Sequence, residues 1–191
     1  MSISEQQFKL AAQILQCDVA AVKAVAEVES RGNGFDPEGF PKTLFEGHWF
    51  FKYTKGKYAV SHPSLCYKTW TRAHYGKTWQ VEKDRLSTAM TLDRTSAMLS
   101  ASWGGFQIMG FNFAQCGYKT VQQFVTDMCK SEDAQLMAFV EIIKSFGLAD
   151  ELRNLDFDSF AYRYNGVDYK KNDYAGKLLR AYKKYKAAPV L

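Results

Sequence analysis

The chain has no long apolar run. Within its 191 residues, no stretch approaches the roughly 18 consecutive apolar residues that a membrane-spanning helix needs. Residues 1–16 carry Glu5 and Lys9 among their apolar positions, and they lack the basic start, continuous apolar centre and small-residue cleavage site of a secretion signal. We therefore expect neither a transmembrane segment nor a signal peptide, and synthesis in the cytoplasm. If the protein acts outside the cytoplasm, another component must release it.

Cysteine and histidine are also scarce, and they are scattered. No two cysteines form a Cys-x-x-Cys pair, and no histidine lies near a cysteine at the spacing of zinc ligands. The residues concerned are Cys17, Cys66, Cys116, Cys129, His48, His62 and His74. This pattern disfavours a structural zinc site, and it defines no disulfide by itself. We expect mostly buried free thiols, no metal and no cofactor.

Charge is balanced except at one end of the chain. An apolar content of 47% and a charged content of 24% are those of an ordinary globular protein, and the length suits one domain with a sizeable core. The net charge of +5 comes from residues 170–186, which hold seven lysines and arginines against one aspartate. Such a local excess favours an anionic partner, such as a cell-wall polymer, lipopolysaccharide or nucleic acid.

Helix-capping residues recur along the chain and predict a mainly helical fold. A Ser, Thr, Asp or Asn just before an apolar-periodic run can accept hydrogen bonds from the first free backbone N–H groups of a helix. Helices are predicted over 4–16, 18–32, 78–92, 93–99, 120–130, 131–147, 156–164 and 172–186, and from 47 onward. Residues 32–41 are rich in glycine and proline, a strand is predicted over 43–46, and 53–76 is irregular. The predicted fold class is mainly α (α+β), with a small β or loop-rich lobe after the second helix.

Glu29 is distinctive within the predicted helix 18–32. It continues the apolar stripe of that helix, at helical spacing from the earlier members. These members are Val22, Val25 and Ala26. Glu29 also lies in the last turn, near the negative end of the helix dipole, and both burial and the dipole disfavour an ionised carboxylate. A carboxyl group that keeps its proton near neutral pH is what glycoside hydrolysis uses as a general acid. The alternative is an ordinary glutamate that pairs with a surface cation, as we expect of Glu27 with Lys23.

A glycosidase that uses two carboxylates needs a second one, and Glu46 is the first candidate. It ends the predicted strand and is followed by His48 and Trp49, so that an acid, a polar ring and a stacking surface converge there. Asp36 and Glu38, in the loop rich in glycine and proline, are the other candidates. The alternative for each is a solvated surface carboxylate.

Two later segments could line a cleft. Gly104 and Gly105 allow the backbone to approach another group closely, and Gln107 beside them could hydrogen-bond a sugar hydroxyl or amide. Tyr162 and Asn165 lie near a predicted turn at the end of a short helix. The alternatives are a helix break that Gln107 bridges, and an ordinary turn.

Together, three segments resemble the goose-type lysozyme and soluble lytic transglycosylase superfamily. That superfamily pairs a Glu-Ser at a helix end with a Gly-x-x-Gln-(Ile/Leu)-Met element and a downstream Tyr-Asn-Gly. The matching segments here are Glu29-Ser30, Gly104 to Met109 and Tyr164-Asn165-Gly166. The chain is more closely similar to the N-acetylmuramidase domain of modular bacteriophage endolysins, through segments 27–30, 32–35 and 44–48. The resemblance covers about residues 6–186.

This resemblance implies a single lysozyme-like domain over 1–191, without a separate cell-wall-binding domain. It implies cleavage of the β-1,4 bond between N-acetylmuramic acid and N-acetylglucosamine in peptidoglycan. Glu29 would be the general acid and Glu46 the second catalytic residue. The substrate-binding residues would be Ser30, His48, Gln107, Tyr162 and Asn165. Where no second carboxylate is within range, the 6-hydroxyl of the sugar could attack instead and give a 1,6-anhydro product.

Three alternative functions stay open at this point. The first is a lytic transglycosylase, which the sequence disfavours because Gly110 stands where that subgroup commonly has proline after the methionine. The second is a non-catalytic peptidoglycan-binding module that uses the same cleft. The third is a nucleic-acid-binding protein, which the local basic charge permits although no nucleic-acid motif is present.

The expected partner is therefore the glycan strand of peptidoglycan, with no nucleic acid. The predicted C-terminal helix could also contact an anionic wall or outer-membrane surface, because cations lie beside its apolar face. That face holds Tyr174, Leu178, Tyr182 and Tyr185. The alternative is a core-packed last helix whose late cations suit the helix dipole. We expect a monomer that acts in the periplasm or cell wall after release from the host cytoplasm.

Overall fold

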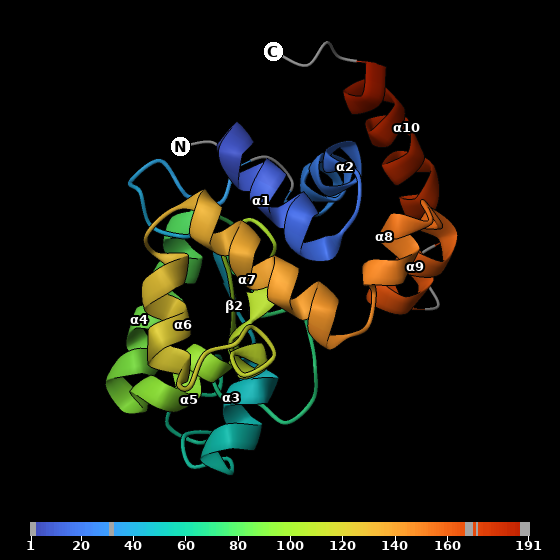
Figure 1. Cartoon of the computed structure of the whole chain (residues 1–191). Coiled ribbons are helices and arrows are strands. Elements are labelled where there is room, and N and C mark those ends of the chain that lie inside the picture. The colour runs from blue at the N-terminus through green and yellow to red at the C-terminus, as the bar shows by residue number, and fades with distance from the viewer. Residues whose placement is uncertain (1–2, 31–32, 167–169, 171, 188–191) are drawn as a thin grey trace.

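A computed structural model describes the chain apart from residues 1–2, 31–32, 167–169, 171 and 188–191 (Figure 1). Its helices are α1 (Glu5–Leu15), α2 (Val19–Ser30), α3 (Gly47–Thr54), α4 (Trp79–Leu92), α5 (Arg94–Leu99), α6 (Val121–Met128), α7 (Glu132–Ser145), α8 (Ala149–Arg153), α9 (Phe157–Asn165) and α10 (Tyr174–Ala187). Its strands are β1 (Thr43–Phe45), β2 (Ala101–Trp103) and β3 (Ile108–Met109), and the 3₁₀ helix η1 (Gly110–Asn112) follows β3. A mainly helical fold with one small sheet confirms the predicted fold class.

Side-chain caps begin most of the helices, as the sequence predicts. Asp18 Oδ1 accepts a hydrogen bond of 2.9 Å from Ala20 N at the start of α2. Similar oxygens cap α1, α4, α5, α6, α7 and α9, and they belong to Ser4, Thr78, Asp93, Thr120, Ser131 and Asp156. Each satisfies a backbone N–H group that has no partner inside the helix. The last helix differs, since α10 begins at Tyr174 rather than at Asn172. The predicted stop at Gly32 lies outside the described residues.

The sheet is antiparallel and has the strand order β1-β2-β3. Thr43 pairs with Trp103 and Phe45 pairs with Ala101, so β1 lies along the full length of β2. The turn from β2 to β3 contains Gly104, whose φ of +72° lies in the left-handed region. The sequence indicated close backbone approach or a helix break here, but it did not predict β2, β3 or α8. The chain instead turns back on itself and brings residues 43–45 beside residues 101–103.

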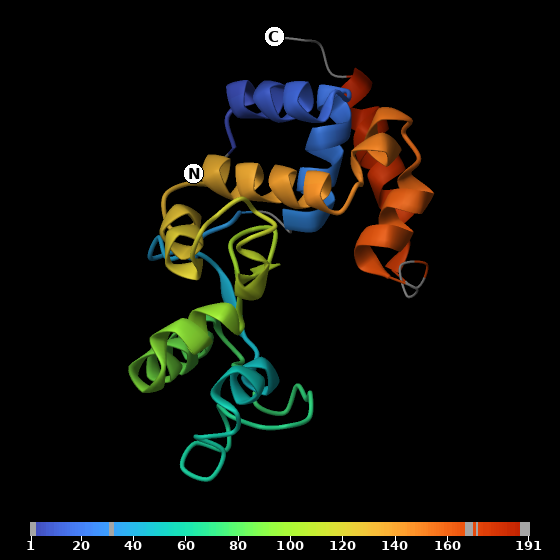
Figure 2. The same ribbon diagram turned by 60° about the horizontal axis from the view of Figure 1, so that its bottom comes forward.

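Two groups of elements lie on opposite sides of this sheet (Figure 2). One contains α1, α2 and α7 to α10, and the other contains α3, α4, α5 and the long connection between α3 and α4. Buried residues of α7 fill the centre of the first group: Leu136, Ala138, Phe139, Val140, Ile142 and Ile143. In the described ranges, no helix combines the length and apolar character that crossing a membrane requires.

The last helix packs along α2 through charged contacts as well as apolar ones. Lys184 Nζ lies 2.7 Å from Glu27 Oε2, and the Tyr185 hydroxyl donates to the same oxygen at 2.5 Å. The predicted pair of Glu27 with Lys23 is therefore wrong. Lys23 Nζ instead lies 2.7 Å from Glu5 Oε1, which joins α2 to α1. The outer face of α2 is a docking face for two neighbouring helices rather than a solvated surface.

All four cysteines are free thiols. Cys66 and Cys116 are buried and Cys17 is half-buried, as expected, whereas Cys129 is exposed. Burial raises the pKa of the Cys17 thiol to about 11 and that of Cys116 to about 12, so both are protonated at neutral pH.

Candidate active site

Glu29 and Ser30 form the last described turn of α2. The earlier members of the apolar stripe are buried and Glu29 is half-buried, so the glutamate lies where the stripe emerges from the core. Its carboxylate is close enough to Tyr164 of α9 to affect that residue. Burial raises the pKa of the Tyr164 hydroxyl, and the negative charge of Glu29 raises it further. The first and third segments of the sequence motif therefore meet in space.

Helix α7 connects the loop after α2 with the turn between β2 and β3. Glu132 Oε1 accepts a hydrogen bond from Gly34 N at 2.5 Å. Gln135 Oε1 accepts from Gly105 N at 2.8 Å, and Gln135 Nε2 donates to Met128 O at 2.9 Å. Both side chains are buried. Neither residue was predicted from the sequence. Their spacing of three residues, on a helix with an apolar face, was a signal that they lie on the same side of the helix.

The glycines of this region are required by close packing. A Cβ atom on Gly34 would lie 1.9 Å from Gln135 Oε1, and one on Gly105 would lie 3.3 Å from the Ser30 Cβ. The backbone of the Gly104–Gly105 turn thus reaches the end of α2 because no side chain separates them. A groove of about 440 Å³ opens at this contact, lined by Ser30, Thr43, Trp79, Gly104, Gly105 and Gln107 among others.

Gln107 is exposed, but its amide is engaged on both sides. Its Oε1 accepts from Ser102 Oγ at 2.9 Å. Its Nε2 donates to Gly104 O at 2.9 Å and to Lys42 O at 3.3 Å. The side chain therefore closes the β2–β3 turn and joins it to Lys42, the residue before β1. This is the bridging alternative considered from the sequence, and Gln107 also lines the groove.

Tyr164 is held by a chain of aromatic contacts that starts at the β2–β3 turn. Phe106 stacks on Phe139 of α7 with ring centroids 4.5 Å apart, and Phe139 meets Tyr164 edge-on at 5.5 Å. Tyr162, the residue proposed from the sequence, lies two positions earlier and is 52% exposed. The apolar stripe of α9 already favoured Tyr164, because Phe157, Phe160 and Tyr164 recur at helical spacing. The side chain of Asn165 lies outside the described part.

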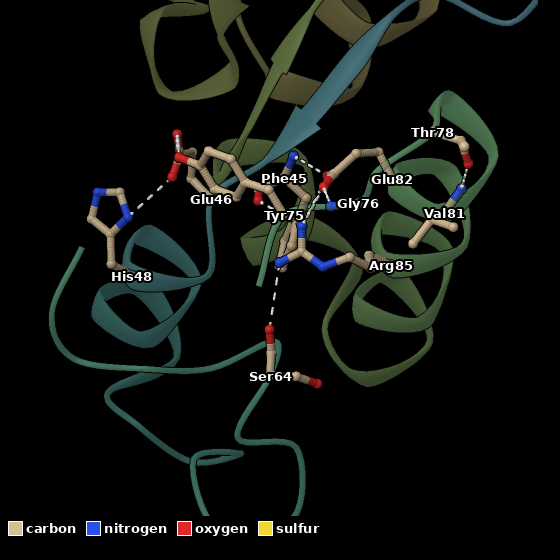
Figure 3. A network of polar contacts seen from close by, with 10 residues as sticks. All are labelled: Phe45, Glu46, His48, Ser64, Tyr75, Gly76, Thr78, Val81, Glu82 and Arg85. Carbon is tan, nitrogen blue, oxygen red and sulfur yellow. Dashed lines mark hydrogen bonds and ion pairs between the residues drawn. The ribbon is translucent and has the colours of Figure 1, made fainter. Parts of the chain in front are cut away.

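Glu46 lies just after β1, at the other end of the strand from the groove contact with Ser30. The Tyr75 hydroxyl donates to Glu46 Oε1 at 2.6 Å, and His48 Nδ1 lies 3.2 Å from Glu46 Oε2 (Figure 3). The Glu46 side chain is 13% exposed and that of His48 is 20% exposed. Burial and the hydrogen bond to Glu46 raise the pKa of Tyr75, so this phenol remains a donor at all ordinary pH values. Sequence reasoning found Glu46 and His48 but not Tyr75.

A buried ion pair on α4 fixes the two segments that meet at Glu46. Glu82 accepts from Phe45 N at 3.1 Å and also from Gly76 N (Figure 3). Arg85 Nη1 donates to the two Glu82 oxygens at 2.7 and 2.9 Å and to Phe45 O at 3.3 Å. Phe45 precedes Glu46 and Gly76 follows Tyr75, so one carboxylate positions both partners of the Glu46–Tyr75 hydrogen bond. In the sequence this pair looks like any surface pair three residues apart.

The other two carboxylates considered from the sequence have structural contacts. Asp36 Oδ1 accepts from Glu38 N and Phe40 N, both at 2.9 Å, and this shapes the loop after α2. Glu38 Oε2 lies 2.8 Å from Lys83 Nζ of α4. Among the described residues, no group of three or more His, Cys, Asp and Glu side chains could hold a metal ion.

Gly110 occupies a place where no side chain fits. A Cβ atom there would lie 1.9 Å from Met98 O. The glycine that departs from the transglycosylase pattern is thus packed directly against the backbone at the end of α5. This contact gives a physical reason for the absence of proline at position 110.

The chain is similar to one family model and to several solved structures. The family model described as N-acetylmuramidase matches residues 18–186. Four solved chains match significantly. Among them, the crystal structure of a Burkholderia AP3 phage endolysin shares 37% sequence identity with this chain and superposes with a TM-score of 0.90. That match covers 97% of this chain and 72% of the endolysin chain. No protein of curated function is significantly similar to this chain.

Proposed function

The chain belongs to the N-acetylmuramidase family, and we propose that Glu29 is the general acid with which it cleaves peptidoglycan. The protein is a glycoside hydrolase of the phage endolysin type, and N-acetylmuramidases cut the β-1,4 bond after N-acetylmuramic acid. The observation that carries the proposal is the convergence at the end of α2. A half-buried carboxyl group lies beside Tyr164, next to Ser30, which contacts the Gly104–Gly105 turn and lines the groove.

In the proposed mechanism, Glu29 protonates the glycosidic oxygen as the bond to the leaving sugar breaks. The sugar left behind passes through a state with oxocarbenium character. Tyr164 assists by remaining neutral, because its raised pKa keeps the hydroxyl protonated beside the carboxylate that forms. A general acid must carry its proton before the reaction, so the proposal requires Glu29 to be protonated when the substrate binds.

Glu46 is proposed to position and activate the attacking water. Gly104 N donates to Lys42 O at 2.8 Å, so the contact between Ser30 and Gly105 lies beside residue 42. From Lys42 to Glu46 the extended chain covers about 13 Å. This backbone span exceeds both the roughly 5–5.5 Å between carboxyl groups that covalent attack needs and the roughly 6.5–9.5 Å of inverting enzymes. The two side chains must therefore reach toward each other for Glu46 to activate a water, and inversion then follows. The polar contacts of Tyr75 and His48 support a fixed orientation of the carboxylate.

Replacement of the acid tests the central assignment. We expect Glu29→Gln to fold normally and to lose roughly 10²- to 10⁴-fold in kcat on purified sacculi, since proton donation to the leaving group is removed. The measurement is the release of soluble muropeptides, with thermal unfolding as the check on folding. Glu27→Gln is the matched control, because Glu27 lies two residues earlier and pairs with α10. Glu29→Gln activity equal to that of Glu27→Gln would refute the assignment.

Product analysis separates hydrolysis from transglycosylation. We expect reducing ends, as water attack requires, and the packing of Gly110 against Met98 supports a site different from that of the transglycosylases. Mass spectrometry of the muropeptides distinguishes reducing from 1,6-anhydro ends. Nuclear magnetic resonance of the first-formed anomer then tests inversion, and an initial product of retained configuration would favour a nucleophile close to the sugar.

We further propose that the enzyme acts as a monomer on the periplasmic or cell-wall face, after synthesis in the host cytoplasm. Both proposed carboxylates, Glu29 and Glu46, come from one chain, which supports a monomeric site. Sedimentation of the purified protein over a range of concentrations tests this point. A wall or outer-membrane contact through α10 belongs to the same proposal, although Lys184 and Lys186 of that helix are paired with α2.

A further inference from the structure

A second concentration of positive charge lies outside the C-terminal helix. The chain from Gly47 to Val81, which contains α3 and its long connection to α4, has no aspartate or glutamate. Its six lysines and arginines are all exposed, and we call them the cationic lobe: Lys52, Lys55, Lys57, Lys68, Arg72 and Lys77. The net charge of the whole chain hides this segment, because acidic residues elsewhere balance it.

The charges of the cationic lobe are not neutralised by the protein. Within the part of the chain that the structure describes, none of the six forms an ion pair. Three of them lie over aromatic rings instead. Lys52 Nζ is 4.4 Å from the Trp49 ring centre, and Lys57 and Arg72 have similar contacts with Tyr58 and Trp70. An aromatic face holds a cation in place without cancelling its charge.

The C-terminal helix differs in this respect. Lys184 and Lys186 lie 2.7 and 2.5 Å from Glu27 and Asp18 of α2, and Arg180 lies 2.7 Å from Asp173. The acidic residues nearest the cationic lobe in sequence, Glu46 and Glu82, are occupied with Tyr75, His48 and Arg85. Three of the five cations of α10 are therefore paired, whereas all six cations of the lobe are available to a partner.

The cationic lobe continues into the wall of the groove. Lys77, its last member, lines the groove together with Ser30 and Gln107, and Trp79 follows it on the same wall. A glycan strand in this groove carries a peptide stem on each N-acetylmuramic acid, and the stems end in free carboxylates. Stems that project from the bound strand would pass Lys77 at the wall of the groove, and their far ends are the groups that would reach the other cations of the lobe.

We propose that the cationic lobe binds carboxylates of the peptide stems on the strand being cut. This inference rests on the groove as the substrate site. The ligand chemistry is a set of carboxylates spaced along a polymer, and exposed lysines recognise such a set by charge rather than by fixed hydrogen bonds. The expected contribution is to substrate binding, with the chemical step at Glu29 unchanged.

The test compares two triple variants that lose equal charge. K52Q/K55Q/K57Q neutralises half of the cationic lobe, and K9Q/R94Q/K119Q removes three exposed cations that lie outside both the lobe and α10. The substrates are purified sacculi, and the same sacculi after carbodiimide amidation of their carboxylates. On native sacculi we expect the lobe variant to show a roughly three- to tenfold higher apparent KM with kcat unchanged, and the control variant to match the wild type.

The difference should vanish on amidated sacculi and in about 1 M salt, where charges are screened beyond about 3 Å. The proposal is overturned if the lobe variant equals the control on native sacculi, or if its loss persists on amidated sacculi. Purified sacculi contain no lipopolysaccharide. The proposal is therefore also overturned if the lobe variant acts normally on sacculi but binds less well to lipopolysaccharide vesicles. K68Q/R72Q gives a second test in a different part of the lobe. Failure of the Glu29 assignment would be seen in kcat of Glu29→Gln and is independent of these KM comparisons.

Discussion

At the scale of single residues, Glu82 positions more of the candidate site than any residue predicted from the sequence. Its carboxylate accepts backbone hydrogen bonds from both segments that carry the Glu46–Tyr75 contact, and Arg85 neutralises it. Glu82 and Arg85 are 7% and 11% exposed at the side chain. A buried pair of this kind positions its surroundings, although its net contribution to stability is small compared with the cost of breaking it.

We expect Glu82→Gln to lower the free energy of unfolding by roughly 2–4 kcal/mol, since Arg85 is left without its counter-charge. kcat on sacculi should fall as well, with KM little changed, if the pair positions Glu46. Urea unfolding and sacculus kinetics at a temperature where the variant is folded provide the two readouts. The double variant E82Q/R85M is the control, because removing both charges should restore part of the stability but not kcat. Unaltered stability in Glu82→Gln would contradict the buried-pair account.

Residues whose role depends on local pattern could be predicted, and residues whose role depends on tertiary contacts could not. Glu29 became a candidate because a carboxylate on an apolar stripe is visible in the spacing alone. Tyr75 and Glu82 were not found, because their partners lie 29 and 37 residues away. Tyr164 was present in the quoted motif, and the periodicity of α9 would have favoured it over Tyr162.

At the scale of elements, helix starts and the strand at 43–46 were predictable, and strands β2 and β3 were not. A capping residue and the N–H group that it satisfies lie within three residues of each other, so the signal is local. Strands β2 and β3 contain three and two residues and owe their existence to pairing with residues 43–45 and with each other. Helix α8 has five residues and no side-chain cap, which explains why it left no pattern.

The contact between α2 and α10 predicts a dependence of stability on pH. Hydrogen bonds from Lys184 and Tyr185 lower the pKa of Glu27 below its ordinary value. A carboxyl group whose pKa is lower in the folded state stabilises that state above the unfolded pKa, and this contribution is lost as the pH falls through the folded pKa. Because the Glu27 side chain is 39% exposed, the contribution at pH 7 should be about 1 kcal/mol or less.

We therefore expect Glu27→Gln to destabilise the protein slightly at pH 7, and this cost to shrink as the pH falls through the lowered pKa of Glu27 and the wild-type carboxylate becomes protonated. Denaturant unfolding of both proteins across this pH range is the measurement. A cost that stays the same at both ends of the range would show that Glu27 acts through packing and not through its charge.

At the scale of the whole molecule, α7 joins the parts that form the groove. It supplies core residues to the group of elements around α1 and α2, and its Glu132 and Gln135 hold the loop after α2 and the β2–β3 turn. The relative placement of Glu29 and the sheet therefore depends on one helix. The Ser131 cap predicted this helix, but the partners of Glu132 and Gln135 lie 98 and 30 residues away in the chain and could not be identified from the sequence.

We expect Gln135→Leu to cost roughly 2–3 kcal/mol of stability, because the variant leaves Gly105 N and Met128 O buried without a partner. Lytic activity should fall more than the folded fraction, since the turn that contacts Ser30 is no longer held. Thermal unfolding and muropeptide release measure the two effects. Gln13→Leu, at an exposed position on α1, is the control and should alter neither. A normal rate in folded Gln135→Leu would show that the turn keeps its place without α7.

The contact of Glu82 and Arg85 with Phe45 has a consequence for the behaviour of the protein at high concentration. An edge strand with free N–H and C=O groups is a template on which another chain can add a strand and begin aggregation. At Phe45 both groups are already occupied by side chains from α4. A second chain therefore cannot add a strand to β1 at Phe45 without displacing Glu82 and Arg85.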